Sequence, residues 1–169
     1  MIKTILVSSV ATLSAFGMAA AGEAGTSKVS VGYLAIDGDG ATVGSIVGRY
    51  NYSFTDNFGI EGEISTGIVE DDINGVDVSA NFGYGIFATG SLPVSDNGSD
   101  IFARVGYGSI ELEGEAGGLS VTEDADGFAF GVGTNIMVAP QHGIRLDYTR
   151  LEGDDAEADT YSVAYVFKF

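Results

Sequence analysis

The sequence predicts an all-β fold, an eight-stranded antiparallel up-and-down transmembrane β-barrel. Three observations predict it: apolar residues alternate with small or polar ones, the alternating segments are long, and the polar positions are rich in glycine. Most segments contain about 9 to 13 residues, whereas soluble strands average about 5 to 6 and a tilted membrane strand needs about 9 to 11. At 169 residues the chain has the size of one domain, which we place at residues 22–169.

Composition excludes several classes of protein. The chain has 24 acidic and 7 basic residues, one histidine and a formal net charge of −17. This balance argues against nucleic-acid binding, which requires a basic surface. The chain has no cysteine, so neither disulfides nor thiolate metal sites can form. Its 45% hydrophobic content is too high for an acidic disordered chain.

Residues 1–21 have the features of a secretory signal peptide. A positive charge at Lys3 precedes an apolar stretch over residues 4–16, and three alanines precede Gly22 as in an A-x-A cleavage site. The alternative is an uncleaved membrane anchor, but the apolar stretch is short and contains polar residues. We therefore expect the mature protein to begin near Gly22 and to function outside the cytoplasm.

Period-two alternation recurs along the rest of the chain, as expected for strands with two different faces. An even number of strands closes an up-and-down barrel with both termini at one end. The eight predicted strands are residues 28–36, 42–54, 58–68, 76–92, 101–110, 127–138, 143–150 and 160–169.

The two faces of these strands differ in an unusual way. One carries large apolar residues such as Tyr50, Tyr84 and Phe128, and the other carries glycine and short polar residues. A soluble sandwich would place Lys and Glu on its polar face. The observed pattern instead fits a barrel with apolar side chains towards lipid and small or polar side chains in a narrow interior. A soluble secreted ligand-binding barrel is the alternative.

Six charged residues fall on the inward-facing positions. We hypothesise that they form a hydrogen-bonded ionic network that fills the lumen, because buried charges must be paired. The alternative is that trapped interior water solvates them, and the two arrangements can coexist. Three are cations and three are anions: Arg49, Glu61, Glu63, Arg104, Arg145 and Asp147.

Most acidic residues fall in the connections that we predict to face outside the cell, and these connections contain neither lysine nor arginine. The acidic runs lack the ligand spacing of an EF-hand loop, so we predict no specific metal site. Two interpretations remain: a hydrated collar, or diffuse attraction of divalent cations that bridge to lipopolysaccharide. The candidates for diffuse binding are Asp124, Asp126, Asp154 and Asp155.

Catalysis is not expected. The sole histidine, His142, lies in a predicted turn at the periplasmic end, and no serine shares its face of the following strand. Hydrolases of the serine or histidine–aspartate type need such a base beside their nucleophile or water. The carboxylates Glu61 and Glu63 would lie inside a filled lumen, out of reach of a polymer substrate. We predict no cofactor.

Five stretches in order along the chain resemble the small eight-stranded outer-membrane β-barrel family, of the OmpA-like transmembrane domain, OmpX-Ail and opacity-protein type. The resemblance implies insertion by the β-barrel assembly machinery, which recognises a last strand ending in an aromatic residue; here that strand carries Tyr161, Tyr165, Phe167 and Phe169. The stretches are GRYNYSFTDNFGIEGE (48–63), IFARVGYG (101–108), GFAFGVGTNI (127–136), GIRLDYTRLE (143–152) and YSVAYVFKF (161–169).

The resemblance also implies a range of roles, including envelope integrity, adhesion, complement resistance and narrow pores. We therefore expect a monomer in the Gram-negative outer membrane, in contact with lipopolysaccharide. Its role would be structural or one of surface interaction through the acidic extracellular loops. The alternative is a narrow porin-like channel for ions or small solutes, lined by Arg49, Glu61, Glu63 and Arg104.

Overall fold

The computed structural model describes residues 24–38, 41–69, 71–72, 77–116, 119–153 and 157–169. The predicted signal peptide lies outside these residues. In the described part of the chain, no helix is long and apolar enough to cross a membrane.

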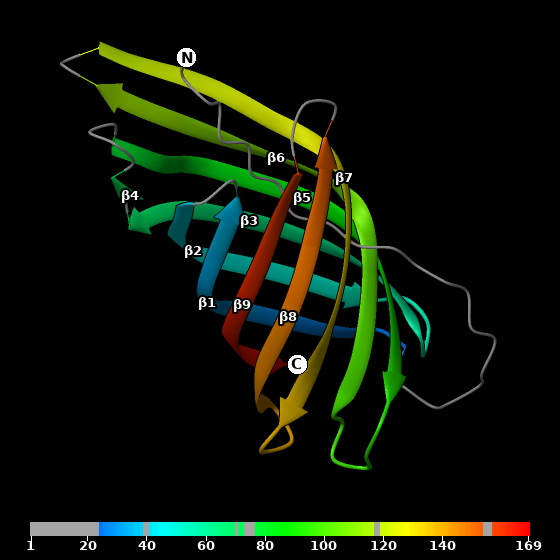
Figure 1. The fold of residues 1–169 in the computed structure, drawn as a ribbon. Coiled ribbons are helices and arrows are strands. Elements are labelled where there is room, and N and C mark those ends of the chain that lie inside the picture. Colours follow the sequence, from blue (N-terminus) through cyan, green and yellow to red (C-terminus); the bar gives the residue numbers. More distant parts are fainter. Residues whose placement is uncertain (1–23, 39–40, 70, 73–76, 117–118, 154–156) are drawn as a thin grey trace.

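Each of the eight predicted segments overlaps one strand, and a two-residue strand is added at the rim (Figure 1). Two strands extend well beyond the predicted bounds: the segments 101–110 and 127–138 correspond to strands Asp100–Ala116 and Leu119–Met137. The longest strands are β5, β6 and β7, with 17, 17 and 19 residues. The strands are β1 (Thr26–Gly38), β2 (Ala41–Ser53), β3 (Phe58–Val69), β4 (Asp71–Asp72), β5 (Asp77–Pro93), β6 (Asp100–Ala116), β7 (Leu119–Met137), β8 (His142–Gly153) and β9 (Glu157–Lys168).

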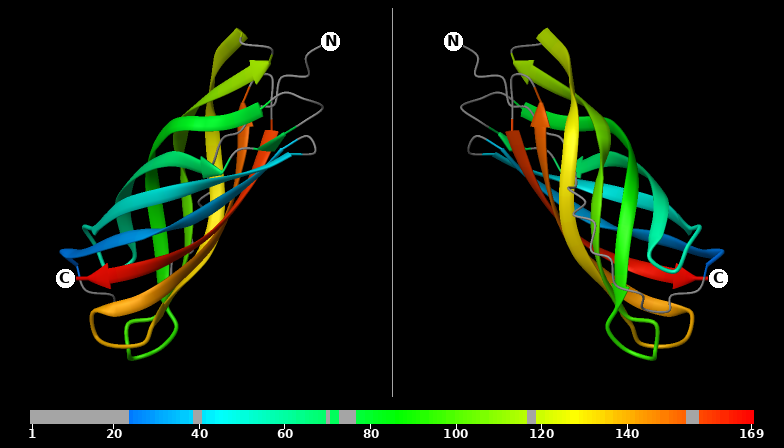
Figure 2. Two further views of the ribbon diagram at one scale, coloured as in Figure 1. Left: turned by 90° about the vertical axis from the view of Figure 1, so that its left-hand side faces the viewer. Right: turned by 90° about the vertical axis from the view of Figure 1, so that its right-hand side faces the viewer.

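The strands form one closed antiparallel ring. Each long strand pairs with its neighbours in the sequence, β3 pairs directly with β5, and β4 adds only two pairs to β5. The ring closes where β1 pairs with β9, from Lys28 opposite Lys168 to Asp37 opposite Asp159 (Figure 2). The predicted eight-stranded antiparallel barrel is confirmed, because among the described residues each of the eight long strands pairs with a neighbour on both sides.

The barrel has two different ends. We call the end with the β2–β3, β5–β6 and β7–β8 turns the turn end, and the end with the other connections the loop end. At the turn end, Phe54 N donates to Phe58 O at 3.0 Å and Val138 N donates to His142 O at 2.9 Å. The longer β5–β6 turn contains Gly98, whose φ of 87° suits glycine.

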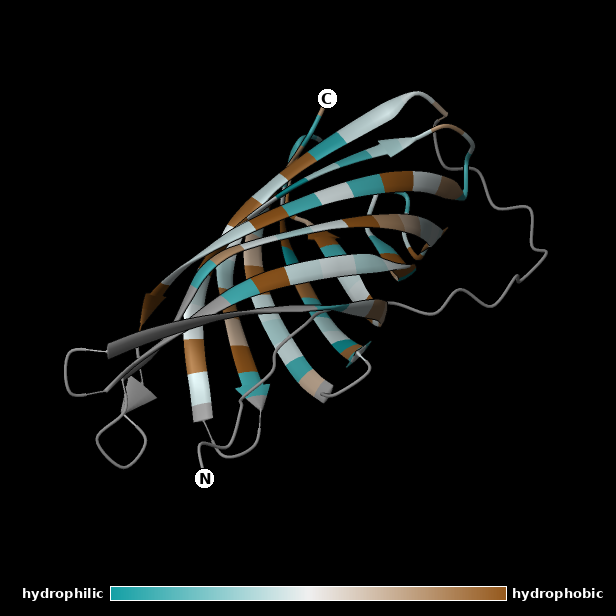
Figure 3. Cartoon of the chain, turned by 90° about the horizontal axis from the view of Figure 1, so that it is seen from above, coloured by the Kyte–Doolittle hydropathy of each residue, from teal (hydrophilic) through white to brown (hydrophobic). Residues whose placement is uncertain are grey.

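Exposure alternates along the strands in the direction that the sequence predicts. From Phe58 to Thr66 in β3, every second side chain is buried. Phe128 is 70% exposed and Ile64 59% exposed on the outer face, whereas Glu61 is 1% exposed inside. Figure 3 shows brown apolar residues alternating with pale or teal ones along most strands. The barrel is therefore apolar outside and polar in the middle of its interior.

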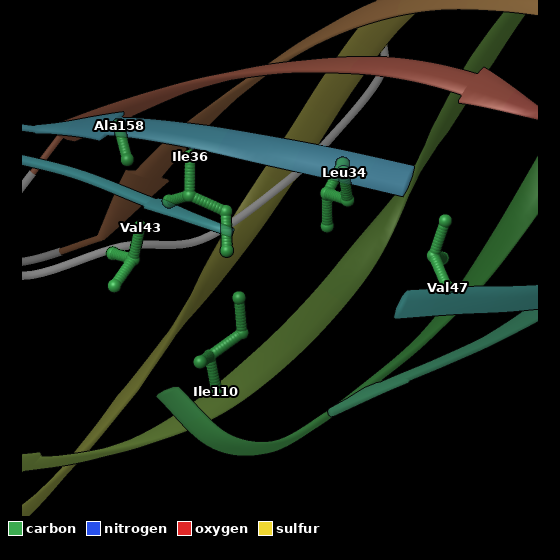
Figure 4. Close-up of a cluster of buried hydrophobic side chains, with 6 residues drawn as sticks. All are labelled: Leu34, Ile36, Val43, Val47, Ile110 and Ala158. Carbon is green, nitrogen blue, oxygen red and sulfur yellow. The ribbon is translucent and has the colours of Figure 1, made fainter. Parts of the chain in front are cut away.

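Towards the loop end the interior is apolar, which the sequence analysis did not predict. A cluster of buried aliphatic side chains from four strands fills this level, as Figure 4 shows. A second cluster contains Phe87, Ala129 and Leu151. The expectation of an interior of glycine and short polar groups is therefore wrong at this level. The first cluster consists of Leu34, Ile36, Val43, Val47, Ile110 and Ala158.

Strands β5, β6 and β7 extend past the barrel at the loop end (Figures 1 and 2). Pairing between β6 and β7 continues to Ala116 opposite Leu119, whereas β8 first pairs with β7 at Gly127 opposite Gly153. The β5–β6 register shifts between Ala80 and Gly83, so a bulge lies where the extension begins. We call this extension the projecting sheet: residues 77–82 of β5, 111–116 of β6 and 119–126 of β7.

Candidate functional site: the ionic network in the barrel interior

The structure brings all six predicted interior charges together at the middle of the barrel. They come from four strands: Arg49 from β2, Glu61 and Glu63 from β3, Arg104 from β6, and Arg145 and Asp147 from β8. Alternation directs each side chain inward, and all six are buried. The β2–β3 register places Arg49 opposite Glu63, so one ion pair follows from hairpin pairing alone.

Arg104 lies at the centre of the network and is 0% exposed. Its NH1 donates to Glu61 Oε1 at 2.9 Å and to Glu63 Oε2 at 2.7 Å. Its NH2 donates to Thr149 Oγ1 at 2.8 Å. The guanidinium carbon lies 4.4 Å from the ring centroid of Phe87, a cation–π contact that also shields it from water.

Arg145 makes a bidentate contact with Glu61. Its NH1 donates to Glu61 Oε2 at 2.6 Å and its NH2 to Glu61 Oε1 at 3.0 Å. Its Nε donates to Asp147 Oδ1 at 2.6 Å. The guanidinium carbon lies 4.3 Å from the ring centroid of Phe102. This geometry uses the planar fork of arginine, which a lysine at the same position could not reproduce.

Arg49 provides the second arginine partner of both Glu63 and Asp147. Its Nε donates to Glu63 Oε2 at 2.6 Å, and its NH2 donates to Asp147 Oδ2 at 3.3 Å. Its NH1 donates to Ser162 Oγ of β9 at 3.2 Å. Arg49 therefore links its own strand β2 to β3, β8 and β9 across the interior.

The contacts form a closed circuit in which charge balances. Each carboxylate accepts from two arginines, and each arginine donates to at least one carboxylate. Three cations and three anions leave the network with no formal net charge. Burying charges is costly unless they are paired and hydrogen-bonded, and all six charges are paired here. Among the described residues, the buried Nε of Arg104 is the one nitrogen of the three guanidinium groups without a hydrogen-bond partner. Direct pairing thus gives every one of the six charges an opposite partner.

The interior narrows sharply at this network. A cavity of about 1040 Å³ opens at the turn end, lined by residues that include Thr26, Lys28 and Lys168. The next cavity inward has only about 20 Å³, and its lining includes Arg49, Glu61 and Arg145 of the network. This volume is close to that of a single water molecule.

A second ion pair lies between these two cavities. The Lys28 ammonium contacts the Asp100 carboxylate, and both residues line both cavities. Asn135 Nδ2 also donates to Asp100 Oδ1 at 2.7 Å. A solute that entered from the turn end would therefore meet this pair first, then the network, and then the apolar cluster at the loop end.

The sequence analysis missed several of these interior residues. Lys28 and Asp100 lie at strand ends, where the alternation is least informative. Phe87 and Phe102 point inward from the apolar runs Ile-Phe-Ala, in which the period-two pattern does not distinguish the faces. A useful indication would have been their parity with charged neighbours, since Phe102 lies two residues before Arg104 on the same face.

The aromatic residues of the predicted assembly signal lie on β9. Tyr161, Tyr165 and Phe169 are exposed on the outer face, and Phe167 is partly buried. The rings of Phe167 and Phe169 stack at 5.9 Å. His142 begins β8, hydrogen-bonds the Tyr165 hydroxyl and lies 5.2 Å from the Phe167 ring, so it belongs to this outer aromatic surface.

The predicted diffuse cation sites are mostly beyond what the structure describes. Asp154 and Asp155, and the side chain of Asp124, lie outside the described residues. Asp126 is exposed and accepts a hydrogen bond from the Tyr107 hydroxyl. Within the described part of the chain, no three His, Asp or Glu side chains are grouped so that they could hold a metal ion.

A closed ring of eight antiparallel strands, apolar outside and ionic within, defines the class of small membrane-spanning β-barrels. The chain belongs to the outer membrane protein beta-barrel domain family, which matches residues 7–169. An outer-membrane barrel protein is therefore what the fold and the family together establish.

Solved structures show the same fold at low sequence identity. Ail, the attachment invasion locus protein of Yersinia pestis, is 18% identical with a TM-score of 0.65, and the match covers 87% of this chain and 100% of Ail. The N-terminal β-barrel domain of Pseudomonas aeruginosa OprF is 10% identical with a TM-score of 0.67, covering 86% and 98%. P. aeruginosa OprG is 12% identical with a TM-score of 0.63, covering 88% and 98%. No curated protein matches the chain.

Proposed function

We propose that this protein has a structural and surface-interaction role, in which a rigid barrel holds the projecting sheet outside the cell. The proposal is based on one observation, the free edge of β7 beyond the barrel wall. Among the described residues, β7 is paired with β8 only from Gly127 onward, so residues 119–126 have a strand partner on the β6 side alone. The loop end would face outward and the turn end the periplasm.

An unpaired strand edge presents backbone N–H and C=O groups that can pair with another extended chain. Main-chain hydrogen bonds would provide affinity for an extended segment without requiring a particular sequence. The strands of the projecting sheet are continuous with the barrel wall, so binding there would be transmitted to a fixed support. This arrangement favours contact with a partner over enclosure of a ligand.

The charge of the projecting sheet indicates the chemistry of the partner. Its β6 and β7 strands carry only acidic charges, with neither lysine nor arginine. Such a surface attracts cationic partners and repels anionic ones. The acids of these strands are Glu111, Glu113, Glu115, Glu123, Asp124 and Asp126.

The relatives support surface contact but suggest a different partner. Ail carries the name attachment invasion locus protein and has been solved with the heparin analogue sucrose octasulfate, a highly anionic ligand. An anionic ligand does not suit the acidic projecting sheet of this chain. We therefore assign it an extended, cationic protein segment as partner, in adhesion or another contact with the host or environment.

The proposed role also requires export of the chain and its insertion into the outer membrane. Cleavage of residues 1–21 would release the mature chain, and the aromatic residues of β9 would direct insertion by the β-barrel assembly machinery. The barrel would remain monomeric, surrounded by lipid and lipopolysaccharide, and would have no catalytic role. The cavity at the network has only about 20 Å³, which supports this role over the alternative of a narrow porin-like channel.

The test uses the protein in lipid nanodiscs and an extended peptide of alternating lysine and valine as the probe. Fluorescence anisotropy measures binding, and isotope-edited infrared spectroscopy reports whether the bound peptide forms a strand. The variant Glu111→Lys with Asp126→Lys should weaken binding several-fold, because it reverses two charges of the projecting sheet.

The matched control is Asp56→Lys with Asp96→Lys, which makes the same charge change on exposed residues at the turn end. It should leave binding unchanged. Equal affinity of the wild type and both variants, or a bound peptide without strand signature, would show that the projecting sheet is not the binding surface.

A further inference from the structure

The lipid-facing wall of the barrel contains a groove of about 550 Å³ close to the turn end. It runs across the outer faces of β3, β5, β6 and β7, far from the projecting sheet. Its side-chain lining is almost entirely apolar and includes Phe58, Gly90, Leu92, Ile101, Ala103 and Val132.

The groove follows directly from the register of these strands. Phe58 lies opposite Gly90, Gly90 opposite Ala103, and Ala103 opposite Val132. One row across the wall therefore has two small residues at its centre and a large residue at each side. In the next row towards the turn end, Leu92 lies opposite Ile101 and closes the groove with two large side chains.

Two polar residues at the groove edge, Asn57 and Thr134, hydrogen-bond the protein backbone through their side chains. Asn57 Nδ2 donates to Ser91 O at 2.9 Å, and Thr134 Oγ1 donates to Asp100 O at 2.9 Å. Charged side chains are absent from the described lining of the groove. Its chemistry therefore suits a hydrocarbon ligand and offers no counter-ion to an ionised one.

We propose that this groove seats one acyl chain of a phospholipid from the leaflet nearest the turn end. The groove is continuous with the lipid-facing surface that the family membership establishes, so hydrocarbon chains already surround it. Its volume lies within the roughly 300–1,000 Å³ typical of small-ligand sites. A chain inside it contacts floor and walls together and gains more dispersion contacts than a chain on the convex wall beside it.

Phospholipid is favoured over a second copy of the barrel by shape. A second barrel presents a convex wall, which would touch the rim of the groove and leave its floor empty. Specific protein interfaces also need roughly 1,000 Å² or more of well-packed surface. The proposal does not depend on the role of the projecting sheet, so either can fail alone.

The experiment is native mass spectrometry of the full chain released from nanodiscs of defined phospholipid composition. Ala103→Leu fills the floor of the groove. The matched control Ala88→Leu adds the same side chain to an exposed position in the adjacent row, opposite Val105 and outside the groove lining. Heat-dependent gel mobility confirms that each variant is folded.

The wild type and Ala88→Leu should each retain one phospholipid per barrel, identified by mass, and Ala103→Leu should retain several-fold less. In bilayers, a spin label near the end of the phospholipid acyl chain should show a motionally restricted component that Ala103→Leu alone diminishes. Equal lipid retention in all three proteins, a wild type without bound phospholipid, a bound free fatty acid, or a dimer that Ala103→Leu abolishes would each overturn the proposal.

Discussion

At its centre the barrel interior is filled by six charged side chains, whereas towards the loop end it is filled by aliphatic ones. Buried side chains fill both levels, but their stabilities have different origins. The ionic level depends on every member, since each carboxylate is compensated by two arginines. In the aliphatic level each side chain contributes its own burial. Substitutions should therefore be strongly coupled at the centre and close to additive between the two separate clusters at the loop end.

Removing Arg104 should have the largest effect. Arg104→Met leaves Glu61 and Glu63 buried with less compensation, and breaking a buried pair in this way costs about 3–5 kcal/mol. Urea unfolding of the protein in lipid measures the change. Arg150→Met is the control, because Arg150 pairs with Asp159 at a partly exposed site where such pairs contribute about 0–1 kcal/mol. Equal stability of Arg104→Met and the wild type would contradict the prediction that the network stabilises the barrel.

Truncation in the aliphatic level should cost nearly as much. Leu34→Ala removes a side chain that is 0% exposed, and such changes cost about 2–5 kcal/mol through lost burial and the cavity left behind. The control Leu146→Ala removes the same atoms from the lipid-facing wall, where lipid can fill the space. If both variants lost the same stability, the loop-end interior would be loosely packed, contrary to the structure.

The outer wall separates the two interior levels from lipid, and a charge there should be unfavourable. Val105 lies beside Arg104 in the chain but faces outward, between Ala88 and Phe130. Val105→Arg should cost about 2–4 kcal/mol if the residue faces the middle of the bilayer. Val94→Arg, in the exposed β5–β6 turn, should have a negligible effect. A harmless Val105→Arg would mean that the two faces are assigned in reverse.

Coupling gives the smallest but most discriminating effect. In a double-mutant cycle of Arg49→Met and Glu63→Gln, the two losses should differ from additivity by about 0.5–3 kcal/mol, because the residues share one ion pair. Leu34→Ala and Leu151→Ala fall in separate clusters and should add within about 0.5 kcal/mol. Additivity in both cycles would remove the distinction between the two levels.

The sequence predicts the parts of this molecule that depend on local alternation. The number of strands, their faces and the inward position of the six charges follow from period-two patterning, and the Arg49–Glu63 pair follows from one hairpin. Contacts across the interior do not follow in this way. Arg104 of β6 meets Glu61 of β3 because of barrel closure and strand stagger, which no local pattern encodes.

The sequence did not predict the aliphatic interior near the loop end, for a related reason. Leu34 and Ile36 flank Ala35, so three apolar residues in succession hide which face each occupies. The projecting sheet was not predicted either. Its β6 and β7 strands resemble acidic loops in composition, and its β5 strand is offset from β6 by a bulge between Ala80 and Gly83. Both features need the register of neighbouring strands.

The proposed closure of the barrel interior by a neutral ionic network can be tested by planar-bilayer recording. The wild-type protein should show no well-defined stepwise openings, because the cavity beside Arg49 and Glu61 has a volume of only about 20 Å³. Reproducible wild-type openings whose conductance changes in Arg104→Met or Glu61→Gln would contradict the claim and favour a narrow channel.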